Sequence, residues 1–384
     1  MTFIRSEIIA EMIKNNYFRL SSRDLEKLFN YFLDEQYSNI GPYFKDGAIM
    51  YGELDHFEDL PKGYYEKIDA GKYNLVQKSD KSLFQYTHGP QSFKAHFFPQ
   101  RSKLWSAEIN EGNLAIKEEK LKKRKKVFWG IRSCDLYAIS TLDRVFLNRD
   151  YKNPNYEVLR KETMIIAVNC GQPSNTCFCT SMDTGPKVKK DFDLAITEVL
   201  SKKKHHFIAE TGSQEAQQIL TDLSFQFASE KDIEEAEKVI NKTSKSMDKA
   251  FDRDKARKFL IEKADDKHWQ DVEKRCLACA NCTLVCPTCF CTTTEDITDL
   301  EGKHTERWQK WDSCFNGDYS YIHGGIVRKS IKSRYRQWIS HKLSSWYDQF
   351  DMSGCVGCGR CITWCPVGID IRQEVKELLV EKDG

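Results

Sequence analysis

Two segments near the C-terminus, CLACANCTLVCP and CVGCGRCITWCP, repeat one cysteine motif. Both read Cys-x2-Cys-x2-Cys-x3-Cys-Pro, and they begin at Cys276 and Cys355. Three thiolates at two-residue intervals allow one tight loop to hold three corners of a cubane iron–sulfur cluster, while the fourth cysteine ligates the other cluster. The spacing therefore predicts two 4Fe-4S clusters with exchanged ligands. The first ligand set is Cys276, Cys279, Cys282 and Cys365, and the second is Cys355, Cys358, Cys361 and Cys286.

Structural zinc is the alternative occupant, because paired Cys-x2-Cys units also form zinc ribbons. Zinc does not account for a third cysteine at the next interval or for a fourth cysteine followed by proline, and both features occur twice. The motif loops also contain small residues, which let backbone N–H groups approach the sulfur atoms. These residues are Ala278, Ala280, Gly357 and Gly359.

Seven of the fifteen cysteines lie outside the two motifs. Cys134, Cys170, Cys177 and Cys179 each fall where a loop meets predicted regular structure, and strand ends of one α/β layer converge on a common edge. Four such thiols are enough for a third cluster, with Arg132 or Asp135 as neighbours. The alternative is a set of inert thiols packed as small hydrophobic groups. The sequence leaves both alternatives open and gives no role to Cys289, Cys291 and Cys314.

The elements that must position these residues indicate an α+β multidomain protein. Residues 1–115 are expected to form a helix plus a β-rich module, and residues 116–225 an α/β layer. Residues 226–268 read as a charged helical connector. Residues 269–384 are expected to form a two-cluster domain like a bacterial ferredoxin, with a helical insert at about 295–350.

Periodicity predicts the individual elements of the first two parts. Ser21 and Asp24 form a plausible cap for a helix whose apolar face is Leu25, Leu28, Phe29, Phe32 and Leu33. In the middle part we expect strands at 127–129, 164–168 and 205–210. We also expect helices from about Asp135, over 193–204 and over 213–223.

The insert carries an aromatic stripe. Tyr335, Trp338, Ile339, Leu343 and Trp346 share one helical face, and basic residues lie largely off it. We expect a helix that covers the clusters and leaves its charged side free to meet a partner protein.

Composition limits the function classes. The chain has 384 residues, of which 40% are hydrophobic and 30% charged, with a net charge of +2. This balance is typical of a globular protein. The N-terminal segment does not read as a signal peptide, and no apolar run approaches the roughly 18 residues of a membrane span. We therefore expect a cytoplasmic protein that binds neither membrane nor nucleic acid, and we interpret the basic run Lys120–Lys126 as a solvated linker.

Several segments together resemble a known family. CLACANCTLVCPTCFCTTTEDITD, KWDSCF, SRYRQWISHKL and CVGCGRCITWCPVGIDI are similar to the beta subunit of cytosolic NAD(P)-linked nickel–iron hydrogenases, also called sulfhydrogenases. GIRSCDLYAI and VNCGQPSNTCFCTSMDTGPK match the middle region of that family, and GPYFKDGAIMY and DLPKGYY its N-terminal region. The same architecture occurs in the iron–sulfur electron-transfer subunit of anaerobic sulfite reductases.

The resemblance implies an electron conduit rather than a catalytic subunit. It implies a hetero-oligomer in which this chain joins nickel–iron hydrogenase subunits and a flavin- and NAD(P)-binding subunit. The chain itself shows no G-x-G-x-x-G after a strand, no P-loop and no paired Cys-x2-Cys set of the nickel–iron type, so we expect no catalytic residue in it. The alternative function is the corresponding electron-transfer subunit of an anaerobic sulfite reductase.

Overall fold

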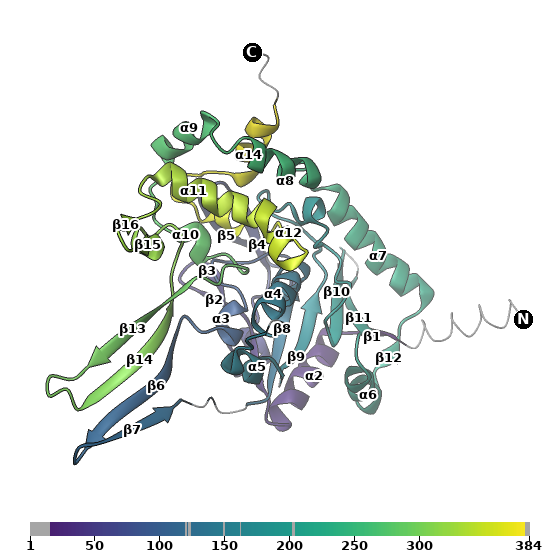
Figure 1. Ribbon diagram of the computed structural model, residues 1–384. Helices are drawn as coiled ribbons and strands as arrows, with labels where there is room; N and C mark the ends of the chain where they lie inside the picture. Colours follow the sequence, from purple (N-terminus) through teal and green to yellow (C-terminus); the bar gives the residue numbers. More distant parts are fainter. Residues whose placement is uncertain are drawn as a thin grey trace, which may run out of the picture.

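The computed structural model describes residues 16–119, 121, 124–148, 150–161, 163–201 and 204–380. Its largest element is an eight-stranded mixed sheet with the order β12-β1-β11-β10-β9-β8-β2-β3 (Figure 1). The pairs β2–β8, β8–β9 and β9–β10 are parallel. The strands are β1 (Tyr17–Leu20), β2 (Ser38–Lys45), β3 (Ala48–Glu53), β8 (Lys126–Arg132), β9 (Thr163–Val168), β10 (Leu194–Leu200), β11 (His205–Thr211) and β12 (Gln226–Phe227).

This sheet joins the two regions that the sequence predicted as separate modules. Strand β2 pairs with β8 across the expected boundary at 115/116, with Asn39 opposite Val127, and β1 pairs with β11. The Asn39 side chain also accepts a hydrogen bond of 2.8 Å from the Trp129 indole. Strand β8 is buried on both faces and lies inside the sheet, with β9 on one side and the N-terminal strand β2 on the other. The boundary at 115/116 therefore does not divide two sheets.

Helices cover both faces of the sheet. Helix α2 (Ser22–Asp34) begins at the predicted cap, where Ser21 and Asp24 bond each other's backbone N–H groups, and it packs on one face. Helices α3 (Lys94–Phe97), α4 (Ser133–Phe146) and α5 (Pro154–Lys161) contribute to the core on the other face. Alternate residues of β8 enter the two cores, Trp129 the first and Phe128 the second. Helix α6 (Gln214–Asp222) also packs on the first face.

One predicted helix is wrong. The segment 193–204 was expected to be helical, but Leu194–Leu200 is strand β10. Leu194 and Ile196 enter one core and Ala195 the other, so both faces of the strand are buried between β9 and β11. Intrinsic helix propensity is a weak preference, and the two neighbouring strands override it. The predicted strands at 127–129, 164–168 and 205–210 and the helices starting near Asp135 and over 213–223 are confirmed.

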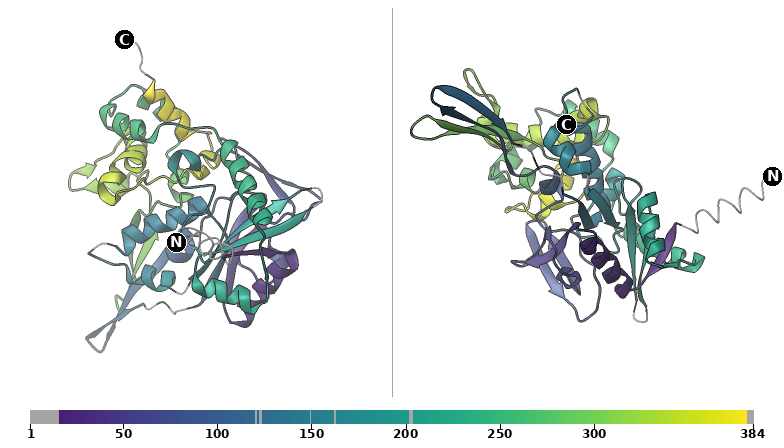
Figure 2. Two further views of the ribbon diagram at one scale, coloured as in Figure 1. Left: turned by 90° about the vertical axis from the view of Figure 1, so that its right-hand side faces the viewer. Right: turned by 90° about the horizontal axis from the view of Figure 1, so that it is seen from below.

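A second sheet forms a projecting arm. Its order is β13-β14-β6-β7, so a hairpin of the insert pairs with a hairpin of the N-terminal region. The arm stands away from the main body in Figure 1 and in the right-hand view of Figure 2. The sequence predicted a helical insert, but the insert begins with strands β13 and β14 and is helical only in its later part. The bounds are β6 (Arg101–Asn110), β7 (Asn113–Glu118), β13 (Thr292–Thr298) and β14 (His304–Trp311).

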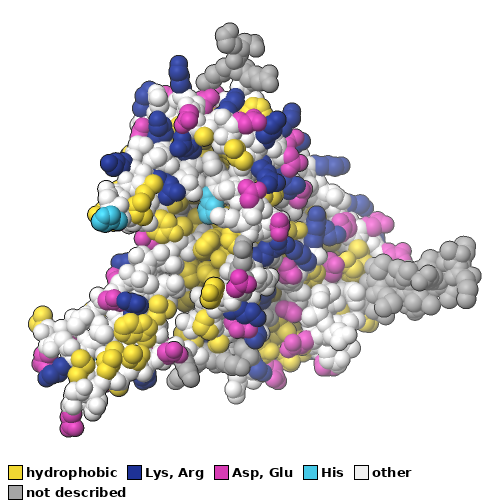
Figure 3. Space-filling model, viewed as in Figure 1, with side chains coloured by type: hydrophobic (Ala, Val, Ile, Leu, Met, Phe, Trp, Pro, Cys, Tyr) yellow, Lys and Arg dark blue, Asp and Glu magenta, His cyan; other side chains and the backbone are white. Residues whose placement is uncertain are grey.

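The arm carries exposed apolar side chains. Ile109, Leu114 and Ile116 are 44%, 63% and 66% exposed, and Figure 3 shows hydrophobic side chains gathered along this arm. Two shorter hairpins complete the strands of the described residues. They are β4 (Tyr64–Asp69) with β5 (Lys72–Gln77), and β15 (Tyr321–Ile322) with β16 (Gly325–Ile326).

The C-terminal helices gather at the top of Figure 1 around a separate core. The predicted aromatic stripe is buried, since Tyr335, Trp338 and Trp346 are each less than 5% exposed. None of the described helices is both long and apolar enough to cross a membrane. The C-terminal helices are α8 (Arg253–Glu262), α9 (His268–Arg275), α10 (Asn281–Leu284), α11 (Ile331–Ser340), a π-helical turn (His341–Ser345), α12 (Trp346–Phe350), α13 (Arg360–Thr363) and α14 (Ile371–Leu379). Helix α7 (Glu230–Lys245) packs instead against β10 and β11 of the large sheet.

A buried ion pair ties this C-terminal region to the large sheet. The Arg360 guanidinium of α13 donates two hydrogen bonds of 2.7 and 2.8 Å to the carboxylate of Asp135, in the first turn of α4. Neither side chain is more than 1% exposed. The same guanidinium donates to the carbonyl oxygens of Gly89 and Gln91. Because all these groups are buried and paired, the motif loop is held at a fixed position against the carboxyl end of the sheet.

Candidate metal centres

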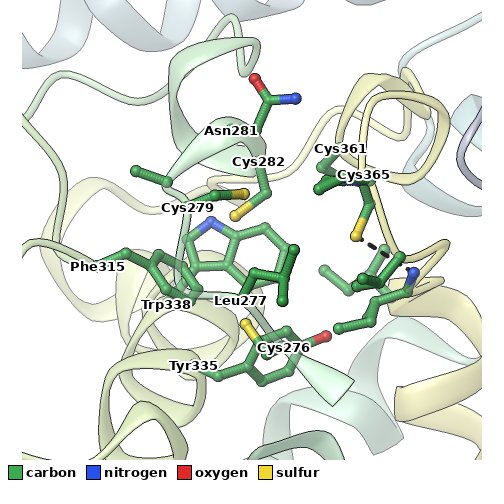
Figure 4. Close-up of a pocket in the computed structure, with 15 residues that line it drawn as sticks. Cys276, Leu277, Cys279, Asn281, Cys282, Phe315, Tyr335, Trp338, Cys361 and Cys365 are labelled. Carbon is green, nitrogen blue, oxygen red and sulfur yellow. Dashed lines mark hydrogen bonds between the residues drawn. The ribbon is translucent and has the colours of Figure 1, made fainter.

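The first predicted ligand set meets in one cavity. Cys276, Cys279, Cys282 and Cys365 all line this cavity, although Cys282 and Cys365 lie 83 positions apart in the chain (365 − 282 = 83). Figure 4 shows their sulfur atoms directed toward this common space. The aromatic rings of Phe315, Tyr335 and Trp338 form its wall, so the predicted helix covers this centre.

The backbone of the first motif is shaped to face the sulfur atoms. Ala278 and Ala280 have φ values of +51° and +65°, and these left-handed residues close the loop around the cavity. The Ala278 N–H donates to the Cys276 sulfur at 3.4 Å, and the Ile369 N–H donates to the Cys365 sulfur at 3.3 Å. Such bonds stabilise thiolates that bind iron. Cys361, which the sequence assigns to the second set, also lines this cavity.

The second predicted set is buried and mutually close. Burial raises the pKa of Cys355 to about 12 and that of Cys358 to about 11, and the Cys286 thiol contributes to both shifts. Burial also raises the pKa of Cys361, with Cys355, Cys358 and Cys286 as charged neighbours. The structure therefore brings all four thiols together. Neutral thiols at such pKa values lose their protons only when a metal takes their place.

Two buried lysines approach Cys286. The ammonium group of Lys342 donates to the Thr288 hydroxyl at 2.9 Å and to the Gly354 carbonyl oxygen at 3.3 Å, and the Thr288 hydroxyl oxygen lies 3.2 Å from the Cys286 sulfur. Lys94 donates at 3.0 Å to the carbonyl oxygens of Cys286 and Cys289. Burial alone lowers a lysine pKa, and it brings that of Lys94 to about 8. For Lys342 the neighbouring thiolates, Cys286 first, outweigh burial and hold the pKa well above its ordinary value.

The third predicted set also meets in one cavity. Cys134, Cys170, Cys177 and Cys179 line this cavity together with His88, Arg132 and Cys358. Cys134 lies in the first turn of α4, after β8, and Cys170 follows β9, so two parallel neighbouring strands deliver them to one edge. The loop with Cys177 and Cys179 completes the cavity. The expected convergence of these four residues is confirmed, whereas their ligation of a metal stays a prediction.

Burial raises the pKa of all four thiols of this third set, and two nearby groups partly oppose that rise. Burial raises the pKa of Cys170, and the fully buried guanidinium of Arg132 opposes that rise. Burial likewise raises the pKa of Cys177 to about 11, and the Ser174 hydroxyl opposes that rise through a hydrogen bond. A set of four thiols is the donor chemistry of an iron–sulfur cluster, and Arg132 supplies a compensating positive charge.

The second motif loop lies between the other two sets. Cys361 lines the first cavity and Cys358 lines the third, so one short loop contacts both. The Phe178 N–H donates to the Gly357 carbonyl oxygen at 2.8 Å, which joins this loop to the segment that carries Cys177 and Cys179. The three thiol sets are therefore arranged in series, with the second in the middle.

Sequence reasoning gave no role to Cys289, Cys291 and Cys314, which the structure places in two thiol pairs. The Cys289 thiol contacts that of Cys286, and the Cys291 thiol contacts Cys314 and Tyr319. The CFC sequence after the first motif is the only local signal for this group. No local sequence pattern could have linked Lys94 to this group, because Lys94 and Cys286 lie 192 positions apart in the chain.

Comparison with known proteins agrees with the geometry of the two motif loops. Residues 275–369 match the family described as a 4Fe-4S dicluster domain. This part of the chain is a 4Fe-4S dicluster domain. The chain is also 29% identical over 321 residues to sulfhydrogenase 2 subunit beta of Pyrococcus furiosus, an alignment that covers 80% of this chain and 90% of that protein. No solved structure matches the chain. The resemblance predicted from the sequence is confirmed, and an iron–sulfur electron-transfer role follows from both findings.

Proposed function

We propose that this chain is the electron-transfer subunit of a multisubunit, NAD(P)-linked nickel–iron hydrogenase. In this proposal the chain contains no catalytic site of its own. The observation that carries this proposal is the serial arrangement of three thiol sets in one chain. The relation to a sulfhydrogenase beta subunit supports a hydrogenase as the whole enzyme.

Each thiol set has a stated role in this proposal. Cys276, Cys279, Cys282 and Cys365 hold the first cluster, and Cys355, Cys358, Cys361 and Cys286 hold the second. A 4Fe-4S cluster takes up and gives back one electron at a time. The protein supplies the thiolates, the backbone N–H groups that bond them and the apolar walls that keep water away.

We further propose that Cys134, Cys170, Cys177 and Cys179 hold a third cluster. Inert thiols would be expected to scatter through the core, whereas these four line one cavity beside a buried arginine. Iron content distinguishes the two cases, because two clusters require about eight iron atoms per chain and three require about twelve. The Cys170→Ser variant should lose about four iron atoms and one EPR signal while the other two signals remain. Eight atoms in both proteins would show that the third set is inert.

The partners in this proposal are the nickel–iron hydrogenase subunits and a flavin- and NAD(P)-binding subunit. The exposed apolar side chains of the arm favour contact with another protein of the complex, because isolated proteins rarely expose such groups together. Native mass spectrometry of the complex isolated from its source tests the assignment. A nickel-containing partner is expected. A siroheme-containing partner would instead establish the alternative, a sulfite reductase.

A further inference from the structure

Lys94 and Lys342 present an electrostatic problem at the second centre. They lie 248 residues apart in the chain (342 − 94 = 248), yet both are 3% exposed and both reach the segment that follows Cys286. Every hydrogen bond described for their ammonium groups goes to a carbonyl oxygen or a hydroxyl, and none goes to a carboxylate. A buried cation without a counter-ion is costly. Some other negative charge must therefore compensate the two lysines.

The backbone directs Lys342 into this position. The residue lies in the π-helical turn His341–Ser345 between α11 and α12, and π turns are rare elements that occur often at functional sites. Lys342, Leu343 and Ser344 are three consecutive buried residues, each at most 3% exposed. A basic side chain is thus placed inward by an irregular turn, although the rest of the segment keeps its basic residues largely outside the core.

The thiolates of the second set would supply the missing negative charge once they bind a cluster. Lys342 donates at 2.9 Å to the Thr288 hydroxyl, which lies 3.2 Å from the Cys286 sulfur, so one hydroxyl links the ammonium group to a ligand of this set. Lys94 faces the thiols of Cys289 and Cys286 and also lies 3.7 Å above the Trp311 ring. Hydrogen bonds to ligand sulfur and nearby charge are two of the factors that set the reduction potential of an iron–sulfur cluster.

We propose that Lys342, assisted by Lys94, raises the reduction potential of the cluster bound by Cys355, Cys358, Cys361 and Cys286. The inference rests on the proposed function, because it requires a cluster at this set. Reduction adds one negative charge to the cluster, and a fixed cation in a low-dielectric site stabilises the reduced form more than the oxidised form. Lys342 therefore makes the second centre, which lies in the middle of the series, easier to reduce.

An EPR-monitored redox titration of the full-length, iron-loaded protein tests this proposal. The signal of the second centre is identified as the one that the Cys355→Ala variant loses. In Lys342→Met, the ratio of reduced to oxidised cluster at a fixed potential should fall at least tenfold. This fall corresponds to a shift of the midpoint potential by about 59 mV to more negative values. Lys94→Met should shift the same signal in the same direction. The signals of the other centres should not move.

Two control variants separate charge from packing. Lys342→Arg keeps the positive charge and should stay near the wild-type potential. Lys258→Met removes an exposed lysine from α8, the helix packed against the π turn, and should change nothing. A wild-type protein without iron would contradict the proposed function itself. Full iron content with an unchanged potential in Lys342→Met would overturn the tuning role alone. If Lys342→Met does not retain iron, an unshifted potential in Lys94→Met would overturn it.

Discussion

The thiol of Cys365 lines one cavity with Cys276, Cys279 and Cys282 of the other motif. Cys286 is likewise the charged neighbour of Cys355 and Cys358. Each motif is thus one residue short of a full ligand set and depends on the other. This exchange explains at the residue scale why the two motifs occur together although a long insert separates them.

The exchange leads to a residue-scale prediction. Cys365→Ala should remove the cluster held by Cys276, Cys279 and Cys282, because that set loses its fourth ligand, and it should spare the cluster held by Cys355. Cys286→Ala should have the opposite effect. Iron analysis and EPR of the two variants measure this. Loss of the cluster held by Cys355 in the Cys365→Ala protein would contradict the exchange.

The ion pair of Asp135 and Arg360 supports a second prediction at this scale. Asp135→Asn leaves the guanidinium of Arg360 buried without a counter-charge, so the free energy of unfolding should fall by about 3–5 kcal/mol. Asp348→Asn is the matched control, because it breaks an ion pair with Arg257 in which both side chains are exposed and should cost less than about 1 kcal/mol. Urea unfolding of both variants makes the comparison. Equal losses would show that the buried pair has no special role.

At the scale of elements, the glycines of the second motif allow two loops to pack together. A Cβ atom on Gly357 would lie 2.6 Å from the Phe178 carbonyl oxygen, and the residue has a φ of +64°. The loop with Cys177 and Cys179 therefore approaches the second motif more closely than any side chain would allow. This contact positions the third thiol set next to the second.

Gly357→Ala should force these two loops apart and reduce the iron content of the protein. Gly112→Ala is a close control, because Gly112 also has a positive φ, +82°, but nothing lies within 4 Å of its Cβ position. The control should lose only about 1–2 kcal/mol from backbone strain and keep all its iron. Iron analysis of both purified variants decides the matter. Full iron content in Gly357→Ala would show that the loop contact is dispensable.

The sequence predicted those elements whose causes are local. The capped helix after Ser21 and the two motif loops depend on residues a few positions apart, and both are found. Strand β10 was missed because its neighbours β9 and β11, rather than its own residues, decide its conformation. The approach of Lys94 to Cys286 was missed for the same reason, since no local pattern connects residues so distant in the chain.

At the scale of the whole molecule, the chain has two kinds of core. The large sheet is filled by side chains such as Phe29, Trp129 and Ile166, which are fully buried without any metal. The C-terminal core instead has the thiols of Cys276, Cys282, Cys355 and Cys365 packed against it. Metal binding at such thiols contributes directly to folding free energy. The two cores should therefore respond differently to the loss of iron.

Removal of iron should loosen the C-terminal domain and leave most of the large sheet intact. Hydrogen exchange measured by mass spectrometry on iron-loaded and iron-free protein should show lost protection over residues 276–291 and 355–369. Strands β10 and β11 should keep their protection, because their cores are apolar and lie away from the ligand sets. The carboxyl ends of β8 and β9 are an informative intermediate case. These strand ends should lose protection only if Cys134 and Cys170 hold iron. If they stay protected while the segment around Cys276 loses protection, the result would argue for two clusters rather than three.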